Sequence, residues 1–334
     1  MASVSTKATI GGRGRLRLRM ASLLQRQGVV LALAGLIVFS ALRYENFLSP
    51  TNIADVLGYN AMFGLIALGM TFVIITGGID LSVGSVAALA SVVAARYSAY
   101  GLLPGLLVPL VVGLAIGLIN GWLIAKVRIA PFIVTLAMLL AARGLALMFS
   151  NNTSIAISYT TSFKALGQSK LGGLPLPAIM TAVLYLAGAL VLSYTRFGRH
   201  VLAVGGNEEA ARLMGLPVQR LKIGVYVLSS VLAALAGVVL AARYGSGQPT
   251  EGSGWELAAI ASVVVGGTIL TGGLGSVWST LAGVLLLGLI FNILNFENSR
   301  GTISLSFYWQ SVIRGGFLLV VVLLQNRLAR RDAP

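Results

Sequence analysis

Few residues in this sequence can carry chemistry. Cysteine is absent and His200 is the only histidine. Disulfides, thiol catalysis, zinc–thiolate sites, iron–sulfur clusters and histidine clusters are therefore excluded. The sequence also lacks a phosphate-binding G-x-x-x-x-G-K-[ST] loop, an H-E-x-x-H pair and a G-x-S-x-G elbow. We predict no catalytic residue, no metal and no cofactor, and any energy source other than an ion gradient must lie on another subunit.

Three charged residues remain as candidates for contact with a substrate. Asp80 is the only acid between Asp55 and Glu208, and Arg143 and Arg314 each lie within an apolar run. A charge at membrane depth usually faces the interior of a helix bundle or a water-filled cavity, so either arginine could hydrogen-bond a substrate hydroxyl. Structural roles are the alternative. Asp80 could be a helix N-cap, and each arginine could bind the carbonyls of a broken helix or extend to a nearby interface.

A short capped helix is predicted in the long polar connection 195–222. In Asn207-Glu-Glu-Ala-Ala-Arg-Leu-Met-Gly215 the asparagine is a good N-cap, and two glutamates suit the positive end of a helix. Gly215 fits the stop, and Pro217 follows it. Such a helix lies on lipid headgroups or fits the groove of a partner, and the basic residues around it suit either role. The residues that we predict to dock a partner are Asn207, Glu208, Glu209, Ala210, Ala211, Arg212 and Gly215.

The composition places these residues in a membrane protein. Of 334 residues, 57% are hydrophobic and only 10% are charged, whereas a soluble domain carries about 25% charged residues. A spanning helix needs about 20 mostly apolar residues. We therefore predict an all-α polytopic protein with a transmembrane domain over 28–326, a disordered basic tail over 1–27 and a second basic tail over 327–334. The ten predicted helices cover 28–44, 54–76, 81–98, 102–125, 131–149, 175–194, 222–243, 254–270, 277–296 and 308–326.

The distribution of basic residues predicts the orientation. A net charge of +15 could suggest nucleic acid, but in a membrane protein basic residues mark the cytoplasmic side. With an intracellular N-terminus and ten crossings, the inner segments hold sixteen Lys and Arg residues and the outer segments six. We predict that both termini are cytoplasmic and that the chain binds lipid rather than nucleic acid.

Small residues and caps mark individual helices. Gly113, Gly117 and Gly121 recur every four residues, as do Ala233, Gly237 and Ala241, and this spacing lets helix backbones approach closely in lipid. Serine and glutamate three apart in Ser253-Gly-Trp-Glu256 predict a capping box at a helix start.

Two glycine-rich stretches interrupt the apolar pattern: Thr76-Gly-Gly-Ile-Asp-Leu-Ser-Val-Gly-Ser85 and Gly266-Gly-Thr-Ile-Leu-Thr-Gly-Gly-Leu-Gly-Ser276. Irregular backbone at membrane depth must be buried in protein or face water, and transporters place broken helices beside their pathway. Two tight cytoplasmic turns are the other interpretation. The candidate translocation-path residues are Thr76, Gly77, Gly78, Asp80, Ser82, Arg143, Gly266, Gly267, Thr268 and Arg314.

The two stretches end alike, with Val83-Gly-Ser-Val86 in one and Leu274-Gly-Ser-Val277 in the other. This match predicts a duplicated architecture. An offset of five helices between the halves would make them inverted repeats, and we expect that arrangement.

Longer strings resemble a known family. The string Gly69-Met-Thr-Phe-Val-Ile-Ile-Thr-Gly-Gly-Ile-Asp-Leu-Ser-Val-Gly-Ser85 is similar to a signature of bacterial monosaccharide ABC-importer permeases. The strings Ala203-Val-Gly-Gly-Asn-Glu-Glu-Ala-Ala-Arg-Leu-Met-Gly215, Glu256-Leu-Ala-Ala-Ile-Ala-Ser-Val-Val-Val-Gly-Gly-Thr268 and Gly272-Gly-Leu-Gly275 are similar to further parts of that pattern. The resemblance runs in order over residues 50–326. Ribose and galactofuranose permeases look most similar, followed by arabinose and xylose permeases.

The resemblance implies a type II-like importer permease, which is not an enzyme, in the bacterial inner membrane. It implies a homodimer or heterodimer of permeases with the sugar path between the two chains. Its other implied partners are a cytoplasmic ATPase that grips the segment 207–215 and an extracytoplasmic sugar-binding protein. Two alternatives are an ion-coupled secondary transporter of a small polar solute and a membrane subunit without a transport path.

Overall fold

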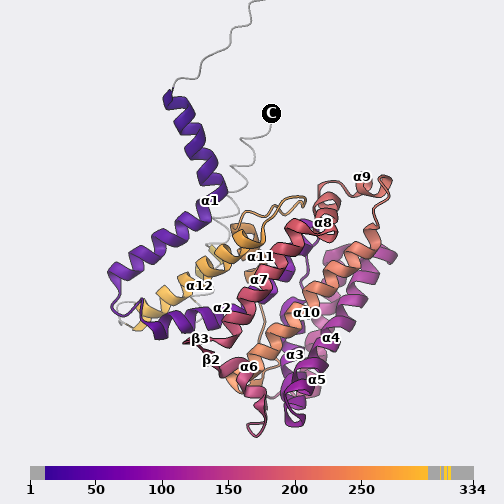
Figure 1. Ribbon diagram of the computed structural model, residues 1–334. Helices are drawn as coiled ribbons and strands as arrows, with labels where there is room; N and C mark the ends of the chain where they lie inside the picture. The colour runs from indigo at the N-terminus through magenta and orange to yellow at the C-terminus, as the bar shows by residue number, and fades with distance from the viewer. Residues whose placement is uncertain (1–11, 300–308, 310–311, 314, 317–334) are drawn as a thin grey trace, which may run out of the picture.

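The computed structural model describes residues 12–299, 309, 312–313 and 315–316, and this part of the chain is mostly helical (Figure 1). The helices are α1 (Gly12–Arg43), α2 (Pro50–Ile75), α3 (Val83–Tyr97), α4 (Leu102–Trp122), α5 (Pro131–Ser150), α6 (Ala165–Gln168), α7 (Leu176–Tyr194), α8 (Arg196–Gly206), α9 (Glu208–Leu213), α10 (Val218–Tyr244), α11 (Trp255–Val265) and α12 (Val277–Ser299). A π-helical turn, Leu123–Val127, extends α4. Short 3-10 turns cover Ser98–Tyr100 and Ser162–Lys164.

Two very short ladders complete the described chain. The strand β1 (Ile155–Ala156) pairs antiparallel with β4 (Ser246–Gly247), so that Ile155 lies opposite Gly247. The strands β2 (Lys170–Leu171) and β3 (Leu174–Pro175) form a small hairpin. Both ladders join connecting segments, and the helices alone build the body of the protein.

The predicted apolar runs coincide with helices, but a count of ten spans is not confirmed. Nine of the ten runs overlap a helix of the structure. Six helices in the described residues are long and apolar enough to cross a membrane, namely α2, α4 with its π turn, α5, α7, α10 and α12. The segment 28–43 of α1 and the helix α11 are apolar but shorter. The tenth run, 308–326, lies largely outside the described residues, and the tail 327–334 lies wholly outside them.

The first helix begins earlier than we predicted. We expected residues 1–27 to be a disordered tail, whereas α1 begins at Gly12, so that the segment 12–27 is helical. Arginine and leucine fill much of this segment, and both residues have high helix propensity. The prediction rested on charge alone, which decides whether a segment crosses lipid but does not prevent a helix.

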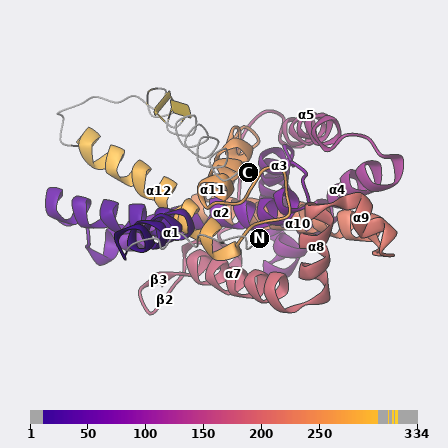
Figure 2. The same ribbon diagram turned by 90° about the horizontal axis from the view of Figure 1, so that it is seen from above.

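The helices α2, α3 and α10 form the centre of the molecule, and in α3 every residue from Val83 to Ala95 is buried. In the most apolar window of α2, 89% of the residues are buried, and the corresponding share for α10 is 67%. For α4, α5 and α7 the share falls to between 22% and 28%. Viewed from above, α2 and α10 lie between α7 on one side and α5 on the other (Figure 2). The outer helices therefore present apolar faces outward, as lipid requires.

The glycine stripe on α4 packs against α10, as its spacing predicted. A Cβ atom on Gly113 would lie 2.6 Å from the Ala234 Cβ, and one on Gly117 would lie 2.6 Å from the Val227 Cα. A Cβ on Gly121 would lie 2.7 Å from the Ile223 Cα. The stripe therefore brings the two backbones together along three turns. On the other side of α10, Gly237 packs against the Ala87 carbonyl of α3.

Replacing Gly117 with leucine should force α4 away from α10. Overpacking of this kind costs about 1–3 kcal/mol, so we expect the G117L variant to have a lower apparent melting temperature in detergent. The matched control is G144L on α5, because a side chain at Gly144 meets no other atom within 4 Å. Equal melting temperatures for the two variants would contradict the packing described here.

Candidate functional site

The helix α8 is fixed at one end of the molecule by its apolar face. At its start the Thr195 hydroxyl accepts a hydrogen bond of 3.2 Å from the Gly198 amide. Val201 and Val204 are buried, and the Phe197 ring lies 6.3 Å from the ring of Phe72 on α2. This connection is therefore packed onto the body of the protein and is not a free loop.

The short helix α9 forms where the sequence predicted it. The Asn207 side chain accepts a hydrogen bond of 2.9 Å from the Ala210 amide, which is the expected N-cap. At the other end Gly215 has φ of +80°, and the Leu216 amide donates to the Ala211 carbonyl at 3.1 Å. Glycine tolerates this left-handed conformation without strain. Both the start and the stop follow from local residue chemistry.

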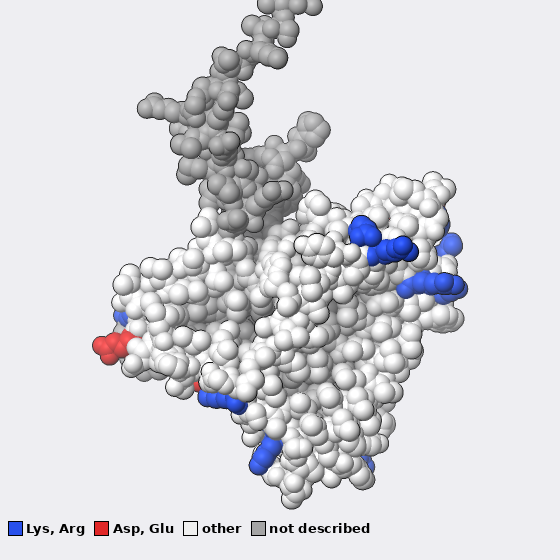
Figure 3. Space-filling model, in the orientation of Figure 1, with Lys and Arg blue, Asp and Glu red and all other residues white. Residues whose placement is uncertain are grey.

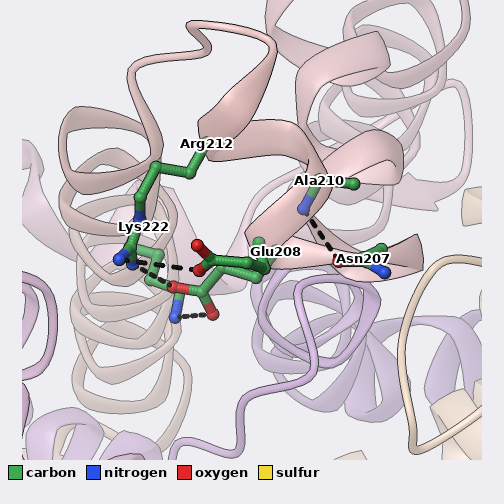
Figure 4. A network of polar contacts seen from close by, with 6 residues as sticks. Asn207, Glu208, Ala210, Arg212 and Lys222 are labelled. Atoms are coloured by element: carbon green, nitrogen blue, oxygen red, sulfur yellow. Dashed lines mark hydrogen bonds and ion pairs between the residues drawn. The ribbon is translucent and has the colours of Figure 1, made fainter.

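Ion pairs tie α9 to the start of α10 (Figure 4). The Lys222 ammonium lies 2.6 Å from a Glu208 carboxylate oxygen. Arg212 lies 3.5 Å from Glu208 and 3.7 Å from Glu209. The tip of α9 lies outside this network of ion pairs and is apolar. Its Leu213 side chain is 81% exposed and its Met214 side chain is 69% exposed. An exposed apolar tip on a braced helix is suited to insertion into a partner.

A cavity of about 210 Å³ lies beside this helix. Its lining includes Arg128 with Glu208, Arg212 and Lys222. Arg128 follows the π turn and has φ of +65°. The connection from α4 to α5 and the connection from α7 to α10 therefore share one end of the molecule, as the predicted orientation requires. Figure 3 shows several blue side chains gathered near this end.

The hydrogen bonds of Asp80 give it a structural role. It is fully buried, and one carboxylate oxygen accepts hydrogen bonds from the Ser82 amide at 3.0 Å and the Ser82 hydroxyl at 2.6 Å. The other oxygen accepts from the Ser229 hydroxyl of α10 at 2.8 Å. The Asn120 amide of α4 donates to the Ser82 hydroxyl at 3.2 Å. We predicted an N-cap of α3, but the N-cap position is Ser82, so Asp80 instead holds the turn before the helix against α10 and α4.

The two glycine-rich stretches are chain reversals with the same local hydrogen bonds. At the end of α2, the Gly77 amide donates to Ile74 and the Gly78 amide donates to Val73. At the end of α11, the Gly267 amide donates to Val264 in the same way and the Thr268 amide donates to Val263. The glycines have φ of +75° and +92°. Both helices thus end in the same type of glycine-dependent turn.

Both reversals lie at the same end of the molecule, so the matching strings do not relate inverted elements. The Gly273 amide of the second reversal donates to the Ile75 carbonyl at the first, at 2.9 Å. One turn away, the hydroxyls of Thr71 and Thr280 lie 3.0 Å apart. The repeat of this helix–turn–helix unit is therefore parallel, and this pair of strings gives no support for the predicted inverted repeat.

The path candidates fall into two groups around these reversals. Gly77 and Gly267 are exposed. Thr76, Gly78, Asp80, Ser82, Gly266 and Thr268 are buried. The reversals bring both groups together at one end, while Arg143 lies elsewhere on α5. Arg314 lies outside the described residues.

Between α10 and α11, a non-helical segment of the chain runs beside α3. Gly247 packs against α3, because a Cβ there would lie 2.7 Å from the Val92 Cα. The Gln248 amide donates to the Ser91 hydroxyl at 3.1 Å, and further along Gly252 contacts the Gly84 carbonyl. The segment 246–254 therefore returns along α3 without forming a helix.

Arg143 holds this non-helical segment. Its guanidinium donates to the Pro249 carbonyl at 2.5 Å and to the Glu251 carbonyl at 2.6 Å. This contact is the structural alternative considered for the arginine, which satisfies carbonyls where the helix is broken. The sequence indicates a break here, because residues 245–254 contain no hydrophobic side chain, but it does not indicate which helix this segment follows.

The helix α11 consequently differs from its prediction. It covers 11 residues, and at 1.5 Å per residue this length crosses about half of a bilayer. Its N-cap is Gly254 with φ of +79°, and the Glu256 side chain accepts from the Gly254 amide at 3.2 Å. The predicted capping box with Ser253 as the cap was wrong, because the left-handed glycine occupies that position.

A second cavity, of about 290 Å³, lies between α2, α11 and α12. The rings of Tyr59 and Phe63 lie 5.3 Å apart on its wall, and the Trp255 ring lies 4.7 Å from Phe63. Asn60, Ser253 and Ser262 add polar groups to the lining. Among the described residues no group of three His, Cys, Asp or Glu side chains could hold a metal ion.

Comparison with known proteins identifies relatives along nearly the whole chain. Residues 52–322 match a family model described as the permease component of the branched-chain amino acid transport system. The chain is 42% identical to the ribose import permease of Bacillus subtilis (strain 168), over 93% of this chain and 96% of the relative. It is 39% identical to the ribose import permease of Escherichia coli (strain K12), over 96% of this chain and 99% of the relative. The L-arabinose transport system permease of the same strain is 39% identical, over 98% and 97% of the two chains. No solved structure matches the chain.

The Asp80 contacts make a prediction that separates structure from charge. D80N keeps one acceptor oxygen for Ser82, so we expect it to retain most of the thermal stability and activity. D80A leaves the buried partners on Ser82 and Ser229 unsatisfied, which costs about 1–3 kcal/mol. Apparent melting temperatures in detergent would measure both effects, with D55A as the control because Asp55 is exposed. A D80N variant that folds normally but has lost all activity would show that the charge itself is required.

Proposed function

Because the chain belongs to the permease-component family of these transport systems, we propose that it is the membrane subunit of an ATP-binding-cassette importer that carries a monosaccharide into the cell. The observation that carries the proposal is similarity along nearly the entire length to ribose and L-arabinose permeases. The substrate class is a pentose or hexose, with ribose and galactofuranose as the first candidates. The chain is a multi-pass membrane protein and a permease subunit, not an enzyme.

The docking unit, defined as α9 with its two caps, Asn207–Gly215, supports a cytoplasmic ATPase as the partner. Its apolar tip at Leu213 and Met214 protrudes from a braced base, which gives a partner both a hydrophobic contact and a rigid lever. The predicted docking residues from Asn207 to Gly215 form this unit. ATP hydrolysis on the partner could thereby displace the end of the permease that holds both reversals.

The proposed sugar path lies between two permease chains, in a homodimer or a heterodimer. Its entrance region is the cavity lined by the Tyr59 and Phe63 rings, since aromatic faces and neutral polar groups suit an uncharged sugar. The path candidates at the two reversals would form its other end, and α5 with Arg143 remains a candidate gate. An extracytoplasmic binding protein would supply the sugar, so the path itself needs only weak affinity.

We place the protein in the bacterial inner membrane with both termini in the cytoplasm. The cluster of Arg128, Arg212 and Lys222 at the docking-unit end supports this orientation. An ion-coupled transporter would need an intramembrane acid available to an ion, whereas both carboxylate oxygens of Asp80 already accept hydrogen bonds.

The proposed function predicts ATP-driven sugar uptake only in the complete assembly. The permease would be reconstituted in vesicles with the ATPase and the sugar-binding protein encoded in neighbouring reading frames, and uptake of radiolabelled D-ribose, L-arabinose and galactofuranose would be measured. We expect uptake of at least one sugar that requires ATP and all partners. Vesicles with the permease alone and a proton or sodium gradient are the second arm, and gradient-driven uptake there would contradict the proposal.

Reversal of the acidic charges on α9 should weaken the ATPase contact. In E208R/E209R, two arginines face Lys222 and Arg212, so the ion pairs that brace the helix become repulsive. We expect ATPase retention in a pull-down to fall by about tenfold, equivalent to about 1.4 kcal/mol, while the permease still inserts. The control variant E45R/D55R changes the net charge by the same amount at two exposed acids near the start of α2, the end distant from the docking unit. We expect this variant to retain the ATPase. Normal retention by E208R/E209R would remove α9 from the interface.

A further inference from the structure

Three backbone segments that are distant in sequence meet beside the docking unit. Ile75 is the last residue of α2, Gly205 lies in the last turn of α8, and Gly272 and Gly273 lie in the second reversal. The Gly273 amide donates to the Ile75 carbonyl at 2.9 Å, which satisfies a carbonyl that the end of a helix leaves without a partner. We call Gly205, Gly272, Gly273 and the Ile75 carbonyl the glycine junction.

The glycine junction has no room for a side chain. A Cβ on Gly205 would overlap the Ile75 carbonyl oxygen and lie 2.5 Å from the Gly273 amide nitrogen. A Cβ on Gly272 would lie 2.9 Å from the Gly77 nitrogen and 3.0 Å from the Gly205 oxygen. A Cβ on Gly273 would lie 2.9 Å from the Gly206 Cα. The three segments therefore touch backbone to backbone.

The crowding is specific to Gly205 and not general to the end of α8. The next residue, Gly206, has no atom within 4 Å of an added Cβ, and its φ lies outside the left-handed region. The chain thus has two adjacent glycines, one enclosed by two other segments and one facing open space. Local helix chemistry does not explain this difference, whereas contact with α2 and the second reversal does.

The glycine junction connects the docking unit to elements deep in the bundle. On one side, α8 leads directly through Asn207 into α9. On the other side, Ile75 ends the most buried span, and the second reversal joins α11 to α12. The hydrogen bond between Thr71 and Thr280 holds α2 to α12 one turn away. A displacement of α8 therefore acts on both reversals at the glycine junction.

We propose that Gly205 is a positioning residue through which a displacement of the docking unit passes to both chain reversals. Side chains can absorb small shifts by changing rotamer, but backbone groups in contact cannot, and close-packed interiors transmit strain. The α8 end, the α2 end and the second reversal consequently move together. The inference rests on the proposed function, because the displacement originates in the ATPase.

The test compares G205A with G206A in the complete complex. Each variant is reconstituted with the ATPase and the sugar-binding protein, and ATP hydrolysis and uptake of radiolabelled D-ribose and L-arabinose are measured in the same vesicles. We expect G205A to retain the ATPase and its basal hydrolysis while sugar uptake per ATP falls by about tenfold, a change typical of altered coupling. G206A should stay within about twofold of wild type, as expected at an open surface position.

A second pair of variants, with a smaller steric conflict, is used if G205A does not accumulate in the membrane. G273A brings a methyl group against Gly206 at the same junction, and G173A is its control. Gly173 has φ of +83° against +81° for Gly273, and a side chain there meets nothing within 4 Å. The pair therefore equalises backbone strain and differs only in the contact. We expect G273A to lower uptake per ATP and G173A to leave it unchanged.

The outcomes separate the inference from the proposed function. If the wild-type complex shows no ATP-driven uptake, the proposed function fails and the inference fails with it. If the wild type transports and G205A or G273A keeps the wild-type ratio of uptake to hydrolysis, only the inference is overturned. If both variants are absent from the membrane while G206A and G173A are present, the junction serves folding alone and the inference is again wrong.

Discussion

The structure depends on one constraint: a backbone amide or carbonyl inside a bilayer must find its partner within the protein. Regular helices meet this demand by themselves, so the informative places are those where a helix stops. At the ends of α2 and α11, two left-handed glycines turn the amides back onto the last helical carbonyls. The Ile75 carbonyl is satisfied by the opposite reversal. In the non-helical segment 246–254, Ser91 accepts from a backbone amide and Arg143 donates to a backbone carbonyl.

This constraint also explains how the buried charges are used. Arg143 donates to two carbonyls, and Asp80 accepts from Ser82 and Ser229. Each charged group supports an irregular stretch of backbone. An uncharged sugar needs no ionic partner, so a permease of this kind can use its few intramembrane charges for architecture without harming transport.

Much of the fold could be predicted because its signals are local. Except at the start of α1 and the end of α11, apolar runs located the helices to within a few residues, the α4 glycines identified a close helix contact, and Asn207 and Gly215 marked both ends of α9. The end of α11 was predicted at residue 270, inside the glycine-rich stretch, whereas the helix ends at Val265, directly before the first glycine of that stretch. The lack of hydrophobic side chains in 245–254 marks a break in the helices, but the path of this segment along α3 has no local signal. It depends on Gly84, Ser91 and Arg143, which come from other helices.

The candidate site was predictable to a similar degree. The docking helix follows from its own caps, and Asp80 stood out as an isolated acid in a long apolar region. The partners of Asp80 could not be predicted, since Ser229 is 149 residues away. The exposed tip at Leu213 and Met214 was also hidden, because an apolar residue in a short polar loop has no period that indicates which way it faces.

The burial of α2 has a consequence for how the protein is made. Its partners α7, α10, α11 and α12 all come later in the chain. The hydrogen-bond partner of Thr71 is Thr280, which lies 209 residues downstream. At about 5–20 residues per second, the ribosome makes Thr280 roughly 10–40 s after Thr71. Until α7 and α10 have been made, α2 lacks the helices that bury it in the finished protein, and only after α12 has been made is its packing complete. Its mean hydropathy of 1.8, below that of the other five long spans, makes α2 the span most dependent on later helices, and the order of translation completes its packing only when α12 has been made.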